Sequence, residues 1–351
     1  MNGKEQLKSM IESTGVSGFE APVAELIQEL FKPYTEDIRK DALGNVIAKI
    51  SGSGQENSPN IMLAGHMDEI GLMVTKIDDK GFIHVTQIGG FDQRTLPAQE
   101  VWVHGKKTLL GLVVAKPPHL TPMDERKKTI PLSGLLIDIG YPAEKAREYV
   151  QVGDLITIKR SMQELQNDWL AGKAMDDRAG VLVMLECLEE LKKLKHTANV
   201  FAVATVQEEV GMRGAITSTY GIMPDIGIAI DVCHGRMPAV PEYNTSPMGG
   251  GPSIAMGPNV HPKVLALLKK VAKETRIPIS LSAAPGATGT DAWAMQISQS
   301  GVATGVVSIP LRYMHTAVET LSYSDIQQSG KLLAYFIAAV DCAFVEELSC
   351  Y

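Results

Sequence analysis

Two short apolar runs that end in acidic residues constrain the fold of this chain more than any other feature. Residues 200–206 are followed by Glu208 and Glu209, and residues 226–230 are followed by Asp231. Runs that are this short and rich in Val, Ile and Ala are typical of strands buried on both faces of a sheet. In open α/β sheets the chemistry gathers beyond the carboxyl ends of such strands, and unpaired buried charge is costly. The pattern therefore predicts bound cations at this edge of the sheet.

The size, charge and cysteine content of the chain narrow its class. With 351 residues it can build a full core and two domains. The net charge of −7 argues against a nucleic-acid partner, because phosphate binding needs a basic face. No apolar run approaches the roughly 20 residues of a membrane span, and the N-terminus lacks the apolar stretch of a signal peptide. Four cysteines without CxxC spacing predict reduced thiols, so we expect a cytoplasmic protein with no membrane partner.

The pattern of the sequence divides the chain into an α/β part and a β-rich insertion. From residue 71 to about 159, short β-rich segments alternate with turn residues, which predicts a small barrel or sandwich. Within it, the proline-rich and charged residues 117–131 are expected to form a mobile loop. Outside it, apolar residues recur at helical spacing in several segments, and the last of these helices starts after Ser322, whose spacing to Asp325 fits a capping box.

Further acidic residues and histidines stand at predicted element boundaries. His66 and Asp68 follow an apolar run, Asp176 and Asp177 open a helix, and His315 follows a strand-like segment. Each of them alone has an ordinary structural explanation, such as a helix cap or a solvated turn. Together with the acidic residues after the two apolar runs, they form an ordered set. Imidazole and carboxylate ligands suit zinc, cobalt or manganese, and shared carboxylates suit two ions about 3.5–4 Å apart.

This ordered set resembles the M42 family of two-metal aminopeptidases over essentially the whole chain. The matching segments are SGFE at 17–20, DALGN at 41–45, GHMDEIG at 65–71, KAMDDRAG at 173–180, VQEEVGMRGA at 206–215, AIDV at 229–232, GTDA at 289–292 and YMHT at 313–316. The resemblance implies a phosphorylase/hydrolase-like α/β/α catalytic domain with a mixed β-sheet, interrupted by an inserted small β-barrel (PDZ-like) that serves dimerisation. The catalytic domain would span 1–69 and 163–351, and the inserted domain 70–162.

The resemblance also implies a role for each candidate residue. Asp176 would bridge two divalent metal ions, zinc or cobalt before manganese or iron. The other ligands would be His66 and Asp231 for one ion, and Glu209 and His315 for the other. Glu208 would be the general base that takes a proton from the attacking water, and Asp68 would orient His66. The implied partners are peptide substrates and further copies of the chain, from a dimer to a tetrahedral dodecamer.

The sequence says less about substrate preference than about the metal ligands. The residues that flank the predicted site are small or apolar: Ile216, Met256, Ala284, Gly286, Ala287 and Leu311. They predict a pocket for Leu- or Met-like N-terminal residues. Arg213 and Arg312 keep a glutamyl-type aminopeptidase open, because an acidic side chain needs a cation in its pocket.

Other function classes remain open at this point. Relatives of the family carry the label endoglucanase or cellulase M, so an endo-1,4-β-glucanase is an alternative. Adjacent carboxylates such as Glu208 and Glu209 are, however, poorly placed to flank a glycosidic bond. A deacylase or carboxypeptidase could use the same metals on another amide. A metal-dependent scaffold without enzymatic activity would have no use for Glu208.

Overall fold

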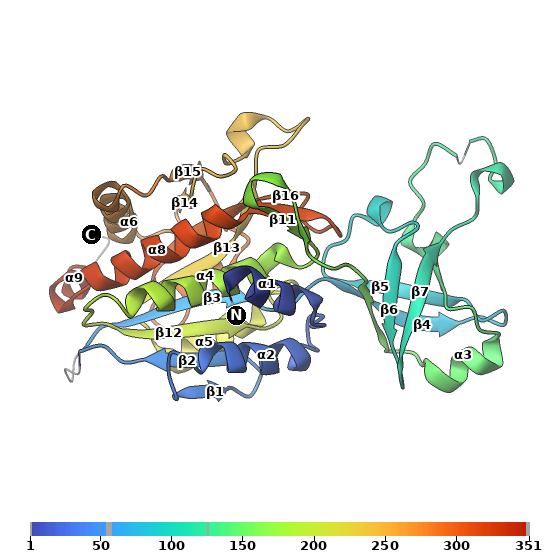
Figure 1. Cartoon of the computed structure of the whole chain (residues 1–351), viewed down its shortest axis with the longest axis horizontal. Coiled ribbons are helices and arrows are strands. Elements are labelled where there is room, and N and C mark those ends of the chain that lie inside the picture. Colours follow the sequence, from blue (N-terminus) through green and yellow to red (C-terminus); the bar gives the residue numbers. More distant parts are fainter. Residues whose placement is uncertain (1, 54–57, 125, 349–351) are drawn as a thin grey trace.

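The computed structural model describes residues 2–53, 58–124 and 126–348, and it shows two bodies side by side (Figure 1). The larger body is a mixed β-sheet covered by helices. The smaller body is a closed antiparallel barrel inserted between β3 and β10 of that sheet. The predicted α/β architecture with a β-rich insertion is therefore confirmed, and the insertion closes into a barrel.

The large sheet has the strand order β1-β2-β12-β3-β13-β16-β17-β11-β10, with β14 and β15 attached beside β16. Its centre, β12-β3-β13-β16, is parallel, and the flanking strands are antiparallel. The strands are β1 (Ile38–Lys40), β2 (Val46–Ile50), β3 (Asn60–His66), β10 (Gln163–Glu164), β11 (Trp169–Gly172), β12 (Asn199–Thr205), β13 (Ile226–His234), β14 (Ser253–Met256), β15 (Ser280–Ala283), β16 (Ala303–Arg312) and β17 (Glu319–Ser322).

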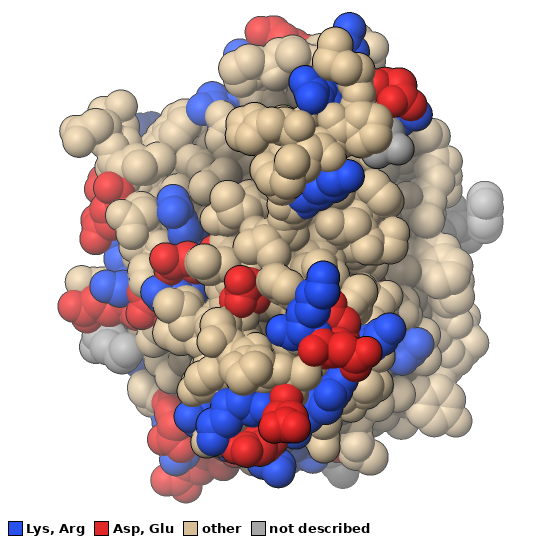
Figure 2. Space-filling model, turned by 90° about the vertical axis from the view of Figure 1, so that its right-hand side faces the viewer, with Lys and Arg blue, Asp and Glu red and all other residues tan. Residues whose placement is uncertain are grey.

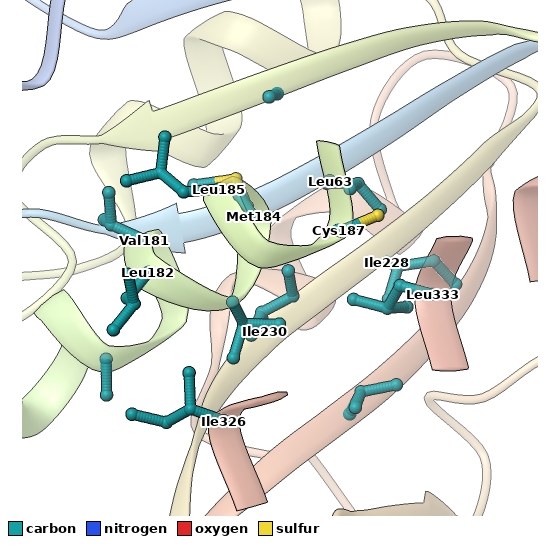
Figure 3. Close-up of a cluster of buried hydrophobic side chains, with 14 of the residues drawn as sticks. Leu63, Val181, Leu182, Met184, Leu185, Cys187, Ile228, Ile230, Ile326 and Leu333 are labelled. Atoms are coloured by element: carbon teal, nitrogen blue, oxygen red, sulfur yellow. The ribbon is translucent and has the colours of Figure 1, made fainter. Parts of the chain in front are cut away.

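Helices cover both faces of this sheet. On one face α4 and α8 pack together, with α1 and α6 beside them, and on the other face α5 packs against α7. Figure 3 shows the core between α4, α8 and the sheet, where Leu185, Ile230 and Leu333 lie among other apolar side chains. The helices are α1 (Gly3–Glu12), α2 (Ala21–Phe31), α4 (Met175–Leu191), α5 (Arg213–Ile222), α6 (Pro262–Thr275), α7 (Asp291–Gln296), α8 (Tyr323–Ala339) and α9 (Cys342–Glu346).

The barrel has its own core and is built from six short strands in the order β4-β5-β8-β7-β6-β9. Buried apolar side chains from all six strands fill its interior, as the β-rich pattern predicts. Its elements are β4 (Gly71–Ile77), β5 (Ile83–Ile88), β6 (Glu100–His104), β7 (Thr108–Val114), β8 (Leu136–Asp138), α3 (Ala143–Tyr149) and β9 (Leu155–Ile158). Short 3₁₀ turns are η1 (Gln93–Thr95), η2 (Pro118–Leu120), η3 (Leu132–Gly134), η4 (Gln166–Asp168) and η5 (Glu242–Asn244).

The barrel side of the molecule carries both signs of charge, and broad uncharged areas lie between them (Figure 2). Leu110 and Leu112 on β7 are each nearly half exposed, as large apolar side chains on the outside of the barrel. In the part of the chain that the structure describes, no helix is long and apolar enough to cross a membrane.

The predicted capping box at the last long helix is wrong. Helix α8 does begin after Ser322, but the Ser322 side chain makes no capping hydrogen bond. Its Oγ lies 3.0 Å from Ser324 Oγ instead. The Asp325 carboxylate is turned away from the helix end and accepts the backbone N–H groups of Gly249 and Gly251, both at 2.8 Å. Tertiary hydrogen bonds to a loop therefore replace the local one.

Candidate active site

Parallel pairing brings the carboxyl ends of β3 and β12 beside the part of β13 that carries Asp231, and β13 continues past this residue to His234. His66 is the last residue of β3 and pairs with Thr205, the last residue of β12. On the other side of β3, strand β13 pairs so that Ala229 lies opposite Ala64. Two residues further along both strands, the side chains of His66 and Asp231 emerge on the same face. The register of the sheet thus assembles residues that are far apart in the sequence.

Asp176 lies between two histidines, and each of its carboxylate oxygens faces one of them. Its Oδ1 is 3.0 Å from His66 Nε2, and its Oδ2 is 3.3 Å from His315 Nε2. His315 Nε2 also lies 3.4 Å from Glu209 Oε1. Asp176 opens helix α4, next to the strand ends, and it is joined to Asp177 by a cis peptide bond.

Among the residues that the structure describes, two groups of side chains could each hold a metal ion. In each group the ligand atoms all lie within 4.8 Å of one another, and Asp176 belongs to both. The groups are His66, Asp176 and Asp231, and Asp176, Glu209 and His315. The structure therefore brings together all five side chains that the sequence nominated as ligands.

Asp68 lies directly behind this constellation and is completely buried. The Nδ1 atom of His66 is 3.2 Å from the backbone oxygen of Asp68 and 3.5 Å from its carboxylate. The shorter distance makes the backbone oxygen the better acceptor for an Nδ1–H group. The carboxylate is instead occupied by the backbone N–H groups of Glu208 and Glu209 and by the hydroxyl of Ser17.

If all the carboxylates of this site were ionised, its side chains would carry a net negative charge. Burial raises the pKa of Glu208 to about 9 and that of Glu209 to about 8. Burial also raises the pKa of Asp231 well above its usual range, and the nearby charge of Asp176 adds to this. For Asp176 itself burial acts in the same direction, but hydrogen bonds with His315 and His66 outweigh it and hold its pKa below its usual value. Clustered carboxylates of this kind fit bound cations, which would supply the missing positive charge.

Two buried carboxylates near the ligands were not assigned a role from the sequence. Glu319, at the start of β17, accepts the backbone N–H of Asp176 at 3.1 Å and that of His315 at 2.7 Å. It therefore fixes two proposed ligands through their backbone. Asp177 accepts the N–H of Gly180, and its Oδ2 is buried without a hydrogen-bond partner. An acidic residue four positions after His315 was the only sequence signal for Glu319.

A cavity of about 690 Å³ opens over these residues. Its floor is formed by the two ligand groups and Glu208, and its walls come from residues 232–234, 243–246, 281–284 and 288–290. Among the described residues that line it there is no lysine or arginine. Of the six small or apolar residues expected to flank the site, only Ala284 lines the cavity. The other five do not line the cavity. Leu311, for example, is buried in the sheet, and Ile216 lies on the outer face of α5.

Comparison with known proteins identifies the class of this fold and site, which is that of the metallopeptidases, a class of hydrolases. The family model described as M42 glutamyl aminopeptidase matches residues 44–332. A lysyl aminopeptidase of Pyrococcus furiosus is 37% identical over 333 residues, which cover 93% of this chain and 94% of the relative. A solved TET aminopeptidase of the marine archaeon Thaumarchaeota archaeon SCGC AB-539-E09 superposes with a TM-score of 0.93, at 33% identity and 99% coverage of both chains.

Two further solved structures bear on assembly and on the alternative function. The Pyrococcus horikoshii TET1 peptidase, described as assembling into a tetrahedron or a large octahedral shell, matches with a TM-score of 0.85 and 31% identity, covering 97% of this chain and 100% of its own. A Thermotoga maritima protein described as an endoglucanase matches with a TM-score of 0.77 and 26% identity, covering 98% of this chain and 99% of its own. The chain belongs to the M42 peptidase family. It is a metallo-aminopeptidase.

Proposed function

We propose that this protein uses two divalent metal ions to remove the N-terminal residue of peptides. The observation that carries the proposal is the position of Asp176, whose two carboxylate oxygens lie 3.0 Å from His66 and 3.3 Å from His315. A carboxylate between two imidazoles, with a further carboxylate in each ligand group, fits a ligand that bridges two ions.

The proposed ligands divide into His66 and Asp231 for one ion and Glu209 and His315 for the other, with Asp176 shared. Imidazole and carboxylate donors favour zinc or cobalt, with manganese and iron as alternatives. When bound, the two ions would activate a water and polarise the scissile carbonyl. The backbone oxygen of Asp68 would hold His66 in the orientation that leaves Nε2 for the metal. Glu319 would fix the backbone of His315 by accepting its N–H.

Glu208 is the proposed general base. It lies at the cavity floor next to Glu209 but belongs to neither ligand group. A carboxylate in this position can take the proton of the attacking water and pass it to the leaving amine. Its backbone N–H donates to Asp68 Oδ1 at 3.0 Å. This hydrogen bond fixes the backbone from which the Glu208 side chain extends.

The two adjacent glutamates give a matched test of these roles. Glu208→Gln should keep both metal ions, measured by mass spectrometry of the metal content, and lose about 10²–10⁴-fold in kcat on leucine-para-nitroanilide. Glu209→Gln should lose metal as well as activity. A Glu208→Gln enzyme that is fully active with both ions bound would overturn the proposed base while leaving the family assignment intact.

The proposed substrates are peptides with an uncharged, Leu- or Met-like N-terminal residue. The cavity walls include Ala255, Val306 and Leu281, and no basic side chain in the described part of the chain lines them. Arg213 is engaged with Gln207, and Arg312 lies over the Trp169 ring, so neither supplies a cation for an acidic substrate. All the acidic side chains in the lining belong to the proposed catalytic floor, which leaves no carboxylate in the walls for a lysine side chain.

A panel of leucine-, lysine- and glutamate-para-nitroanilide tests this preference. We expect the highest kcat/KM on the leucine substrate. Faster turnover of the lysine substrate would give this chain the specificity named for its Pyrococcus furiosus relative, and faster turnover of the glutamate substrate that of the family model's name. N-acetyl-leucine-para-nitroanilide and carboxymethyl-cellulose should both be resistant. Hydrolysis of the cellulose would favour the endoglucanase alternative.

The proposed assembly is a homo-oligomer in which the barrel pairs subunits, as a dimer or as a dodecamer built from dimers. The support is the similarity to a TET1 peptidase described as a tetrahedral assembly, and the nearly half-exposed Leu110 and Leu112 on β7. Light scattering after size-exclusion chromatography measures the mass. The double variant Leu110→Asp, Leu112→Asp should lower it, and an unchanged mass would exclude β7 as the pairing surface.

A further inference from the structure

Two sequence motifs have no role in the mechanism so far, although both reach the site. They are SGFE at 17–20 and DALGN at 41–45. Both converge on residues 206–209, the segment between β12 and α5 that carries Glu208 and Glu209. We call residues 206–209 the base loop. The loop is neither helix nor strand. Its carbonyl oxygens accept backbone N–H groups of residues 211–214, and its own N–H groups donate elsewhere.

Four consecutive backbone N–H groups of the base loop each donate to a side chain from the N-terminal part of the chain. In chain order the pairs are Val206 with Asn45 Oδ1 at 3.0 Å, Gln207 with Glu20 Oε1 at 3.1 Å, Glu208 with Asp68 Oδ1 at 3.0 Å, and Glu209 with Asp68 Oδ2 at 3.2 Å. We call Glu20, Asn45 and Asp68 the amide clamp. The acceptors come from three separate segments of the chain, so the base loop is held by all three.

Other hydrogen bonds fix the clamp residues themselves. Asn45 donates through Nδ2 to Asp41 Oδ2 at 2.6 Å and to the backbone oxygen of Gly214 at 3.0 Å. Glu20 Oε1 also accepts the N–H of Gly18 at 2.6 Å. All three clamp residues are buried. A buried side chain that is itself hydrogen-bonded transmits a defined position to the group it holds.

The base loop needs such support because its backbone is strained. Gln207 has a φ of 56° and Met212, just before α5, has a φ of 53°. Left-handed backbone at residues other than glycine costs of order 1–3 kcal/mol and persists only where the surroundings over-determine it. The N–H of Gln207 is the one that Glu20 accepts, so the clamp acts at the strained residue.

We propose that Glu20 and Asn45 are positioning residues for the aminopeptidase reaction, which hold the base loop so that Glu208 and Glu209 face the cavity. They touch neither substrate nor metal and act through the backbone of the loop. The kinetic consequence rests on the proposed roles of Glu208 and Glu209. The structural consequence, a loop that opens when the clamp is removed, does not depend on them.

Glu20→Ala removes the acceptor for Gln207 and should lower kcat about 10–100-fold, the range found when a residue that supports a metal ligand is lost. KM should change much less, because the cavity walls do not include Glu20. Glu20→Gln keeps a carbonyl oxygen at the position of Oε1 and should restore most of kcat. Asn45→Ala should repeat the Glu20→Ala effect from the other side of the loop.

Hydrogen exchange of the metal-free protein gives a readout that is independent of activity. In Glu20→Ala the backbone amides of residues 206–209 should exchange at least tenfold faster than in the wild type, and in Glu20→Gln at a rate close to the wild type. The matched control is Asp78→Ala, which removes a carboxylate that likewise accepts two backbone N–H groups, those of Lys80 and Phe82, but in the barrel. This control should alter neither kcat nor exchange of the base loop.

The outcomes separate this inference from the proposed function. Faster exchange without a fall in kcat would mean that the clamp holds the loop but that catalysis does not need it, which overturns the positioning role. Unchanged exchange in both Glu20→Ala and Asn45→Ala would overturn the clamp itself. If Glu20→Ala does not fold, the exchange of residues 206–209 and kcat in Asn45→Ala, each compared with the values for Glu20→Gln and the wild type, still test the clamp. A failure of the two-metal proposal would instead be seen in the metal content of Glu208→Gln and Glu209→Gln.

Discussion

Arg178 Nη2 lies 3.1 Å from Glu69 Oε1, and both side chains are buried. Arg178 follows the proposed bridging residue by two positions, and Glu69 follows Asp68. The guanidinium also donates to the backbone oxygens of Met67 and Ser13. This buried ion pair thus joins the start of α4 to the end of β3 and to the segment after α1, directly behind the site.

Breaking this pair should destabilise the protein strongly. Arg178→Met leaves Glu69 with Lys173 as its remaining buried cation, and it leaves backbone oxygens without donors. We expect a loss of about 3–5 kcal/mol in the free energy of unfolding, because Glu69 loses one of its two buried cationic partners and the buried backbone oxygens lose their donor. Urea denaturation of the metal-free protein measures it. The control, Lys32→Met, breaks an exposed pair with Glu29 and should cost less than about 1 kcal/mol. Equal effects of the two variants would contradict this account.

Two glycines on helix α5 should respond to alanine with opposite signs. A Cβ at Gly214 would meet the Asn45 amide oxygen and would lie 2.5 Å from both the backbone nitrogen and the backbone oxygen of Val206. Gly214→Ala should therefore cost about 1–3 kcal/mol and disturb the amide clamp. A Cβ at Gly221 meets nothing within 4 Å, so Gly221→Ala should stabilise the protein by about 0.5–1 kcal/mol. Thermal unfolding compares the two, and stabilisation by Gly214→Ala would refute the packing argument.

Much of the architecture could be predicted because it follows from local patterns of apolar and polar residues. The apolar runs at 200–206 and 226–230 became β12 and β13, and the alternating segments from 71 onward became the barrel. The helix after Met175 also forms, but its first part is buried on all sides rather than along one stripe, because residues 175–185 are all buried. The ligand set could be predicted because its members follow apolar runs or stand near element boundaries, although β13 continues past Asp231 to His234.

The parts that could not be predicted depend on contacts between distant segments. Asp325 has the sequence position of a capping residue, yet it binds two amides 74 and 76 residues away. From the sequence, Glu20 is expected to be the residue before a helix. In the structure its carboxylate accepts the backbone N–H of Gln207, which lies 187 positions later in the chain. Such hydrogen bonds leave no periodic signal, because each needs only one polar residue. The residues that line the cavity could not be predicted for the same reason. Exposure and packing against the sheet determine which small residues face the cavity, and neither can be read from the local sequence.

Variants of the ligands should lose metal in a graded way. Asp176→Asn weakens both sites, so it should retain the least metal, whereas Asp231→Asn and His315→Ala should each retain about one ion per subunit. Mass spectrometry after dialysis counts the ions. Zinc or cobalt at about 100 times the dissociation constant should stabilise the wild type by about 2.7 kcal/mol for each ion bound, and Asp176→Asn much less. If Asp176→Asn binds two ions as tightly as the wild type, the shared-ligand geometry is not the metal site.

The stability of the protein should depend on pH through Glu20. Burial raises the pKa of Glu20 to about 7 from its ordinary 4.5; the negative charge of Asp68 adds to this, and hydrogen bonds from the N–H groups of Gly18 and Gln207 oppose it. Between these two values the folded protein binds more protons at Glu20 than the unfolded chain does. This carboxyl therefore makes the free energy of unfolding fall as the pH rises from about 4.5 to about 7, and contributes no further change above that.

Glu20→Gln removes this titration while keeping a carbonyl oxygen for the two amides. The free energy of unfolding of Glu20→Gln relative to the wild type should therefore increase between pH 5 and pH 7.5 and then level off. Urea denaturation of both proteins without metal, at four pH values across this range, measures the difference, from which the ionisations common to both proteins cancel. Glu25→Gln, at an exposed residue on α2, is the control for the general effect of replacing a carboxyl by an amide. A flat difference for Glu20→Gln would mean that Glu20 keeps its ordinary pKa, and that the carboxylate holds the base loop in its charged form without a penalty from burial.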